Sequence, residues 1–339
     1  MKKKASNASG QNISSVDQRI IDSFRLKEGE VISGEELSSL LNVSRTAIWK
    51  HIQSLKSLGY RIEALPSQGY RLLSSPDLLI PSEIRSGLTT ERLGKRIICF
   101  TETDSTNSIL FKLAEDGAEE GTVVIADAQR RGKGRLGREW ISPGGVNLYF
   151  SMLLKPDILP VEAYQLTFLS AVAVSRAIER TTSLIPRIKW PNDILVNDRK
   201  VAGLLNEMSA ETEKVNFVVL GIGINLNMKR DQFPVDIRFP ASSLLLEGGS
   251  EIGRCAFIRT LITELDDLYA VYMKEGDEPV RKEWLVRCDI EGRTVSVSGN
   301  DLDFTGVVSR VDETGGLVVR LPDGREEKVF SGDVRIVNR

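Results

Sequence analysis

A glycine-rich, strongly cationic stretch between Ala128 and Trp140 is the part of the sequence best suited to chemistry. It reads AQRRGKGRLGREW, with five cations among three glycines and no carboxylate before Glu139. Glycine lets the backbone approach a ligand closely, and arginine offers a planar set of donors that fits carboxylates and phosphates. Because the cations repel one another, we expect this loop to close around an anionic ligand that carries a carboxylate and phosphates.

Other interpretations of this stretch are less consistent with its neighbours. Its glycines, Gly132, Gly134 and Gly137, fit the G-x-G-x-x-G pattern, but a dinucleotide site needs a helix directly afterwards. Here ISPGG and another strand-like run follow, which argues against a Rossmann site. A kinase loop is disfavoured because the VAIK and DFG motifs are missing. A solvated surface loop or a nucleic-acid patch stays open for this stretch alone.

The composition indicates a globular protein of two or three domains. The 339 residues are 41% hydrophobic and 27% charged, with a formal net charge of −2, which are ordinary values. Three widely spaced cysteines suit a reducing compartment, and neither a signal peptide nor a membrane span is expected, so we predict a cytoplasmic protein. The single histidine, His51, argues against histidine-based nucleophilic or metal chemistry.

Residues 16–74 predict a winged helix-turn-helix domain, after a polar tail at residues 1–15 that we expect to be disordered. Three helices are expected, the second begun by a capping box of Ser33 and Glu36, and two short strands joined by PSQG follow. The third helix would contact DNA through polar and cationic residues at its start and on its outer face: Ser44, Arg45, Thr46, Lys50 and Gln53. A helical protein-interaction module is the alternative.

The rest of the chain predicts two further domains, which makes the fold class multidomain α+β. A linker at residues 75–95 would lead into a larger domain at residues 96–289. There, strand-like runs come in pairs more often than they alternate with helices, which favours a mixed-sheet α+β domain over a doubly wound one. Short β-rich runs separated by turns predict a small β-barrel at residues 290–339.

Four more segments place polar or small residues near strands. DSTN at 104–107 would cap a helix, and KWPND at 189–193 ends a strand at a proline that breaks the ladder. Lys200 begins a strand next to two small residues, and GIGIN at 221–225 sets glycines inside an apolar strand. Interior glycine often marks a close contact. Each segment alone also has a structural interpretation, as a cap, a turn, a hairpin or a bulge.

Together and in this order, these motifs resemble those of biotin protein ligases. The motifs that carry the resemblance are STN at 105–107, GKGRLGREW at 132–140, KWPND at 189–193, RKVAG at 199–203 and GIGIN at 221–225. The N-terminal winged helix and the small C-terminal domain, expected to be SH3-like, make the chain similar to the bifunctional bacterial form, which also represses biotin genes. The resemblance extends from about residue 16 to the end of the chain.

The resemblance implies an ATP-dependent, AMP-forming ligase. Such enzymes join biotin to ATP to give biotinyl-5′-AMP and pyrophosphate, and then pass biotin to one lysine of a biotin carboxyl carrier protein. ATP, biotin and Mg²⁺ are the implied substrates and metal, biotinyl-5′-AMP is the implied corepressor, and operator DNA and a homodimer of adenylate-bound chains are the implied partners. No covalent enzyme nucleophile is needed, which agrees with a chain that holds one histidine.

The resemblance also assigns residues to the site. The biotin-binding residues would be Ser105, Thr106, Asn107, Gln129, Lys133, Gly134, Arg135, Lys200 and Gly203. The ATP or adenylate side would comprise Arg138, Trp140, Asn192, Asp193 and Asn225, and the catalytic residues would be Lys200, Arg135 and Lys189. Asp193 is also a candidate partner for magnesium, but no metal ligand is assigned.

One departure from the family pattern concerns Lys133, where the family often has arginine, because lysine keeps the charge but loses the bidentate geometry. Two other functions stay open at this point. One is a transcription factor that senses a small molecule without ligase activity. The other is a lipoate or octanoate ligase.

Overall fold

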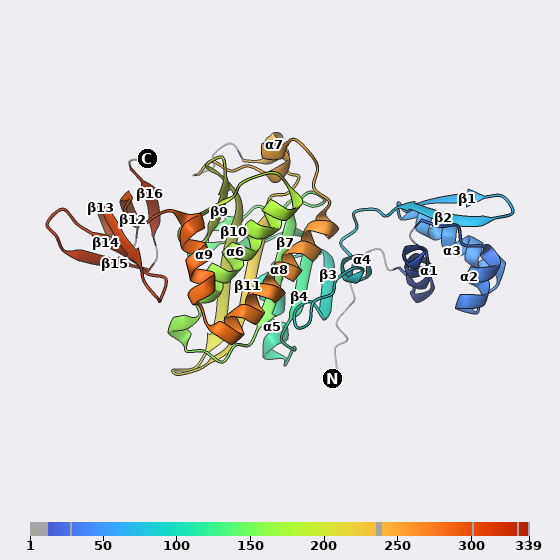
Figure 1. Cartoon of the computed structure of the whole chain (residues 1–339), viewed down its shortest axis with the longest axis horizontal. Helices are drawn as coiled ribbons and strands as arrows, with labels where there is room; N and C mark the ends of the chain where they lie inside the picture. The colour runs from blue at the N-terminus through green and yellow to red at the C-terminus, as the bar shows by residue number, and fades with distance from the viewer. Residues whose placement is uncertain (1–12, 28, 235–238, 300–301, 331, 338–339) are drawn as a thin grey trace. The chain divides into compact units, whose positions relative to one another are not determined.

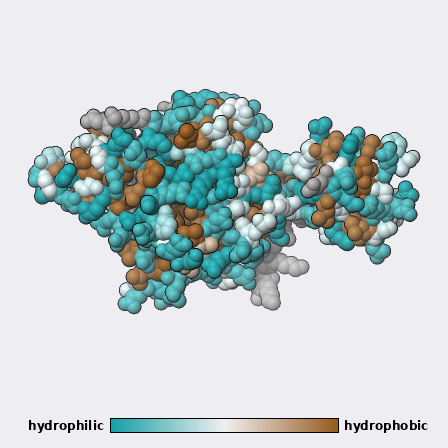
Figure 2. All heavy atoms as spheres, viewed as in Figure 1, coloured by the Kyte–Doolittle hydropathy of each residue, from teal (hydrophilic) through white to brown (hydrophobic). Residues whose placement is uncertain are grey.

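The computed structural model describes residues 13–27, 29–234, 239–299, 302–330 and 332–337 (Figure 1). The chain divides into two compact units, residues 1–86 and 87–339. Of the tail predicted at residues 1–15, only the last three residues are described, and Ser14 already caps the first helix. Among the described residues, no helix is long and apolar enough to cross a membrane. The face in Figure 2 is mostly hydrophilic, with apolar residues in separate patches.

The first unit is a winged helix-turn-helix, as predicted. Its elements are α1 (Ser15–Leu26), α2 (Gly34–Leu41), α3 (Arg45–Ser57), β1 (Arg61–Leu65), β2 (Gly69–Ser74) and α4 (Pro81–Arg85). Apolar residues at helical spacing on α1 and α3, among them Ile21, Ile48 and Ile52, meet in one core. The strands β1 and β2 form the antiparallel wing.

Serine side chains begin the three main helices by accepting a backbone amide, at Ser14, Ser33 and Ser44. The capping box predicted for α2 forms only in part. The Ser33 hydroxyl accepts the amide of Glu36, but the Glu36 carboxylate lies 3.3 Å from the ammonium group of Lys27. The lysine side chain therefore takes the place of the backbone donor that the sequence pattern predicted.

A mixed seven-stranded sheet forms the centre of the second unit, in the order β3-β4-β7-β11-β10-β9-β8 (Figure 1). Among its described strands, only β3 and β4 are parallel neighbours. Its strands are β3 (Arg96–Thr103), β4 (Thr122–Gln129), β7 (Leu148–Leu154), β8 (Arg187–Lys189), β9 (Asp193–Val196), β10 (Arg199–Ala210) and β11 (Val215–Ile224). The prediction of a mixed sheet is therefore confirmed.

Helices cover both faces of this sheet. On one face α5 (Thr106–Glu115) packs its Leu110 against Val124, Leu153 and Val219. On the other lies α6 (Gln165–Thr181), where Thr167 accepts a hydrogen bond from Asn206. Beside α6 lie α8 (Arg254–Glu275) and α9 (Glu278–Cys288), and α7 (Leu244–Gly248) follows a loop after β11 (Figure 1).

The C-terminal part is a five-stranded antiparallel sheet in the order β15-β14-β13-β12-β16. Its strands are β12 (Thr294–Gly299), β13 (Leu302–Val311), β14 (Leu317–Arg320), β15 (Glu326–Val329) and β16 (Asp333–Ile336). The expected small β-rich C-terminal part is thus confirmed, although it belongs to the same compact unit as the central sheet. Within the described residues the two edge strands, β15 and β16, do not pair, so hydrogen bonds do not close the predicted barrel.

Candidate functional site

A single pocket of about 290 Å³ collects every residue that the sequence assigned to biotin, ATP or catalysis. Those residues come from the start of α5, from the ends of β4 and β8, from the turn before β9, from β9 and β10, from the position after β11, and from the cationic loop. They are Ser105, Thr106, Asn107, Gln129, Lys133, Gly134, Arg135, Arg138, Trp140, Lys189, Asn192, Asp193, Lys200, Gly203 and Asn225. The pocket lies on the α5 face of the central sheet.

Glycines on β10 and β11 form the floor of this pocket. Gly203 and Gly223 are paired across the two strands, and a Cβ atom on either would lie within 2.9 Å of the Trp140 ring. A Cβ on Gly221 would lie 2.3 Å from Oδ1 of Asn107. Pairing is regular from residue 221 to 224, so the bulge interpretation of GIGIN is wrong and close approach is the reason for these glycines.

The cationic loop is a short hairpin between β5 (Gly132–Lys133) and β6 (Glu139–Trp140). The amide of Gly134 donates to the carbonyl of Arg138 over 2.7 Å, and a single 3₁₀ turn at Arg135–Gly137 forms the tip. No α-helix follows it directly, because the next described strands are β6 and β7, so the exclusion of a dinucleotide fingerprint is confirmed.

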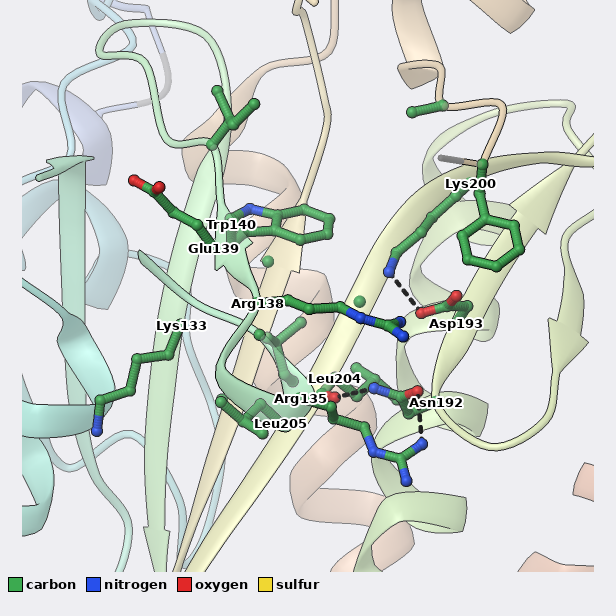
Figure 3. Close-up of a pocket in the computed structure, with 18 of the residues that line it drawn as sticks. Lys133, Arg135, Arg138, Glu139, Trp140, Asn192, Asp193, Lys200, Leu204 and Leu205 are labelled. Carbon is green, nitrogen blue, oxygen red and sulfur yellow. Dashed lines mark hydrogen bonds and ion pairs between the residues drawn. The ribbon is translucent and has the colours of Figure 1, made fainter. Parts of the chain in front are cut away.

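The cations of this loop already have partners in distant segments. Lys133 lies 3.0 Å from Oε1 of Glu207, and Arg138 donates to both carboxylate oxygens of Asp333 at 3.1–3.2 Å. In Figure 3 Lys133 points away from the Arg135 and Arg138 side chains. The expectation that these cations repel one another until an anion arrives is therefore wrong for these two residues, because acidic residues of β10 and β16 balance them.

Arg135 instead faces the KWPND segment. Its Nη1 donates to Oδ1 of Asn192 over 3.3 Å, and Nδ2 of Asn192 donates to the carbonyl of Leu204 over 2.5 Å (Figure 3). The Trp190–Pro191 peptide bond is cis. Arg135 thus joins the tip of the cationic loop to the turn between β8 and β9 across the pocket.

Two lysines lie beside Asp193. Nζ of Lys200 is 2.6 Å from Oδ1 of Asp193 and 5.2 Å from the centre of the Trp140 ring. Lys189 lies over the Phe239 ring at 4.1 Å. Burial lowers the pKa of Lys189, although Asp193 acts in the opposite direction. The pocket therefore holds ammonium groups that are partly desolvated, where an anion gains more from a cation than it would in water.

The start of α5 supplies hydroxyl and amide groups to the other end of the pocket. Ser105 is 3% exposed and occupies the N-cap position, but its side chain makes no capping bond to the described helix, so its hydroxyl is not explained by capping. Oε1 of Gln129 accepts the amide of Thr106 over 2.8 Å. Asn225 has less to offer a ligand than Ser105, because its side-chain amide already donates to the carbonyl of Ser242 over 3.0 Å.

Several lining or contacting residues were missed by the sequence analysis. Ser151 is a fully buried serine within the apolar strand β7, a pattern that could have marked it. Glu207 and Asp333 belong to no motif, and their partners lie 74 and 195 positions away in the chain. No sequence signal could have connected these pairs.

The residues assigned to DNA lie at the start of α3 and along its exposed side. Arg45, Thr46, Lys50 and Gln53 are exposed, whereas the Ser44 hydroxyl accepts the amide of Ala47 to cap the helix. Trp49, which the sequence analysis missed, is 53% exposed on the same helix. His51 lies 2.9 Å from Asp17 of α1 and so fixes α3 within the unit. Contacts of these residues with DNA remain predictions.

Comparisons with known proteins agree with this geometry. Residues 98–225 match the biotin/lipoate A/B protein ligase family, and residues 18–71 match a helix-turn-helix domain. The bifunctional ligase/repressor BirA of Bacillus spizizenii is 38% identical over 95% of this chain and 99% of its own. The biotin–[acetyl-CoA-carboxylase] ligase of Paracoccus denitrificans is 34% identical over 66% of this chain and 94% of its own.

A solved structure shares the second unit's architecture. The biotin protein ligase of Aquifex aeolicus, in complex with biotin and ATP, superposes with a TM-score of 0.61 at 28% identity. The match covers 71% of this chain and 99% of that one.

Proposed function

This chain belongs to the family of bifunctional ligase/repressor BirA proteins, and we propose that it activates biotin with ATP, transfers it to a carrier lysine and represses transcription from operator DNA. It is a biotin protein ligase joined to a DNA-binding unit. The observation that carries the proposal is the single pocket in which the ligase motifs meet. The matched ligase domain argues against a sensor without ligase activity, and the relatives named as biotin ligases argue against an octanoate ligase.

Activation brings the carboxylate of biotin to the α-phosphate of ATP, so two anions must be held together. We assign Lys200 to the developing charge at this junction, because its ammonium group enters the pocket between Asp193 and the Trp140 ring. Lys189 would attract the phosphates and Arg135 would close the loop over the adenylate. Fixed charges of this kind stabilise a transition state without the need to reorganise during the reaction.

The chemistry of the lining residues indicates which end of the pocket would hold biotin and which would hold the nucleotide. Hydroxyl and amide groups from α5 and β4 suit the ureido ring of biotin, whereas Trp140 offers a flat apolar face to a base. Nε1 of Trp140 is buried and has no hydrogen-bond partner among the described residues. We therefore place biotin toward α5 and the nucleotide toward the indole and the KWPND segment.

Mg²⁺ would arrive with ATP. Among the described residues no cluster of three acidic, cysteine or histidine side chains could hold a metal, so no protein cage fits the ion. Magnesium commonly uses phosphates, water and one or two carboxylates. Asp193 could contribute one oxygen only by giving up part of its contact with Lys200.

The regulatory half rests on the helix-turn-helix unit. α3 carries arginine, lysine, threonine and glutamine and has no acidic residue, a composition that suits the DNA backbone and base edges. We propose that adenylate-bound chains dimerise on operator DNA and that the acceptor is a biotin carboxyl carrier protein. Since ATP, DNA and such carriers occur in the cytoplasm, we place the protein there.

The direct test is to incubate the purified protein with ATP and biotin and to look for biotinyl-5′-AMP by mass spectrometry. We expect the adenylate together with pyrophosphate. Octanoate and lipoate serve as the comparison, and formation of either acyl adenylate in preference to the biotin product would contradict the proposal.

A further inference from the structure

We infer that Glu207 is a positioning residue that makes Asn107 accept, and never donate, a hydrogen bond toward the ligand, so that this end of the pocket selects for an N–H group. The inference rests on the proposed function. It concerns two residues that lie close together although they are 100 positions apart in the sequence.

The orientation of the Asn107 amide follows from its neighbours. Nδ2 of Asn107 lies 2.8 Å from Oε2 of Glu207 and 3.1 Å from the carbonyl oxygen of Leu205. Both neighbours can only accept a hydrogen bond, so the amide nitrogen must face them, and both of its protons are used. Asn107 is 4% exposed and packs directly on Gly221, which leaves water little access.

The opposite side of the amide is held by Ser151. Its hydroxyl, from a residue that is fully buried, donates to Oδ1 of Asn107 over 2.6 Å. An amide oxygen has two lone pairs, so one remains for a ligand. Asn107 can therefore offer the pocket an acceptor only.

Biotin carries two N–H groups in its ureido ring, whereas lipoate and octanoate carry none. An N–H donor would satisfy the remaining lone pair, but an acyl chain would leave it buried without a partner. A buried polar group without a partner is costly. The pair of Glu207 and Asn107 thereby distinguishes among the substrates of a family whose name includes both biotin and lipoate.

Glu207 also contacts Lys133 through its other oxygen, at 3.0 Å. The test must therefore distinguish the ion pair with Lys133 from the orientation of Asn107 that we propose for Glu207. Lys133→Met removes the ion pair and leaves the contact between Glu207 and Asn107 in place. Glu207→Gln keeps the shape of the side chain but adds a donor, which permits the Asn107 amide to turn over.

The test measures ligand binding by titration calorimetry, with biotin and the two cyclic carbamate analogues in which one ureido N–H is replaced by a ring oxygen. In the wild-type protein one analogue should bind about tenfold or more weakly than biotin, because its oxygen faces an acceptor. In Glu207→Gln the two dissociation constants should become similar. Lys133→Met should keep the wild-type ratio, whatever its effect on overall affinity.

An unchanged ratio in Glu207→Gln, or an equal loss of the ratio in Lys133→Met, would overturn the inference. If Glu207→Gln fails to fold, Glu207→Ala replaces it and should reduce the same ratio. A wild-type protein that binds no biotin would refute the proposed function instead.

Discussion

We assign Lys200 to the charge that develops when the biotin carboxylate attacks ATP, so its removal should affect the first step. We expect Lys200→Ala to slow adenylate formation by about 10²-fold or more, the scale for losing one preorganised charge contact. Pyrophosphate release measures this step. Arg199→Ala is the matched control, because Arg199 pairs with Glu247 at 3.0 Å outside the pocket. A folded Lys200→Ala protein with full activity would end the assignment.

Arg135 should retain the adenylate, because it bridges the loop tip to Asn192. Arg135→Gly removes that bridge, and biotinyl-5′-AMP should then escape and react with lysines of bystander proteins. Biotin on serum albumin added to the reaction measures the leak. Equal labelling of albumin by the wild type and the variant would show that Arg135 does not close the site.

Lys189 gives the site a pH dependence. Burial lowers the pKa of its ammonium group, so it loses its charge at a lower pH than an exposed lysine would. ATP binding should therefore weaken as pH rises into the alkaline range. In Lys189→Arg the charge persists at any such pH, and the decline should be smaller. Parallel pH profiles of the ATP dissociation constant in the two proteins would contradict this role.

Among single residues, the sequence motifs predicted those that the pocket brings together, but not those that act through distant pairs. The close contact at the glycines of GIGIN and the turn at KWPND could be predicted from residue types, because small residues and prolines give local signals. Asp333 and Glu207 leave no such signal, since their partners lie in the cationic loop, far away in the sequence. The charges around the cationic loop were misjudged for the same reason.

Among the elements, the C-terminal sheet completes the site. Nε1 of Trp190 donates to the carbonyl of Gly315 over 3.1 Å, and Asp333 on β16 holds Arg138. Gly315 has a φ of +78°, and a Cβ there would lie 1.9 Å from Cδ1 of Tyr164. The turn between β13 and β14 is thus fitted against the segment that we assign to ATP.

Gly315→Ala should dislodge this turn, raise the KM for ATP and lower the melting temperature. Gly324→Ala is the control, because Gly324 also has a left-handed φ, +87°, but a Cβ there would meet no atom from the rest of the described chain within 4 Å. Backbone strain is present in both variants, whereas the collision with Tyr164 occurs only in Gly315→Ala. If both variants change the KM for ATP equally, the contact between the turn and Trp190 is not important for the site.

Helix α3, which we assign to DNA, should separate the two activities. Lys50→Ala and Trp49→Ala should each weaken DNA binding, the first by losing a phosphate contact and the second by losing an apolar surface. Adenylate formation should be unchanged, since both residues belong to the first unit. Fluorescence anisotropy with duplexes selected from a random library measures the binding. Unchanged affinity in both variants would remove α3 from the DNA interface.

Most elements could be predicted because their residues carry local patterns. The strands of the central sheet were apolar runs, and serine caps marked α2 and α3. The sequence from Val161 to Arg180 predicts a helix, but residues 160–162 form a 3₁₀ turn and α6 begins at Gln165. The proline at 160 suits the first position of either structure, so this boundary had no clear local signal.

For the whole molecule, ligand binding and DNA binding should be linked. One winged helix makes few phosphate contacts, and a dimer adds effective concentration on a palindromic site. If the adenylate favours the dimer, the dimer must favour DNA by the same free energy. Biotinyl-5′-AMP should therefore tighten both self-association and DNA binding. Sedimentation and fluorescence anisotropy with and without adenylate test this. If neither the self-association nor the DNA affinity changes with adenylate, the repressor proposal is wrong.

The contact between His51 and Asp17 has a practical consequence for spectroscopy. His51 is the only imidazole in the 339 residues, and it lies on the helix that we assign to DNA. Selective isotope labelling of histidine would therefore give a single imidazole signal that needs no assignment among histidines. A titration with DNA or with adenylate can be followed at that one resonance, which reports on the first unit.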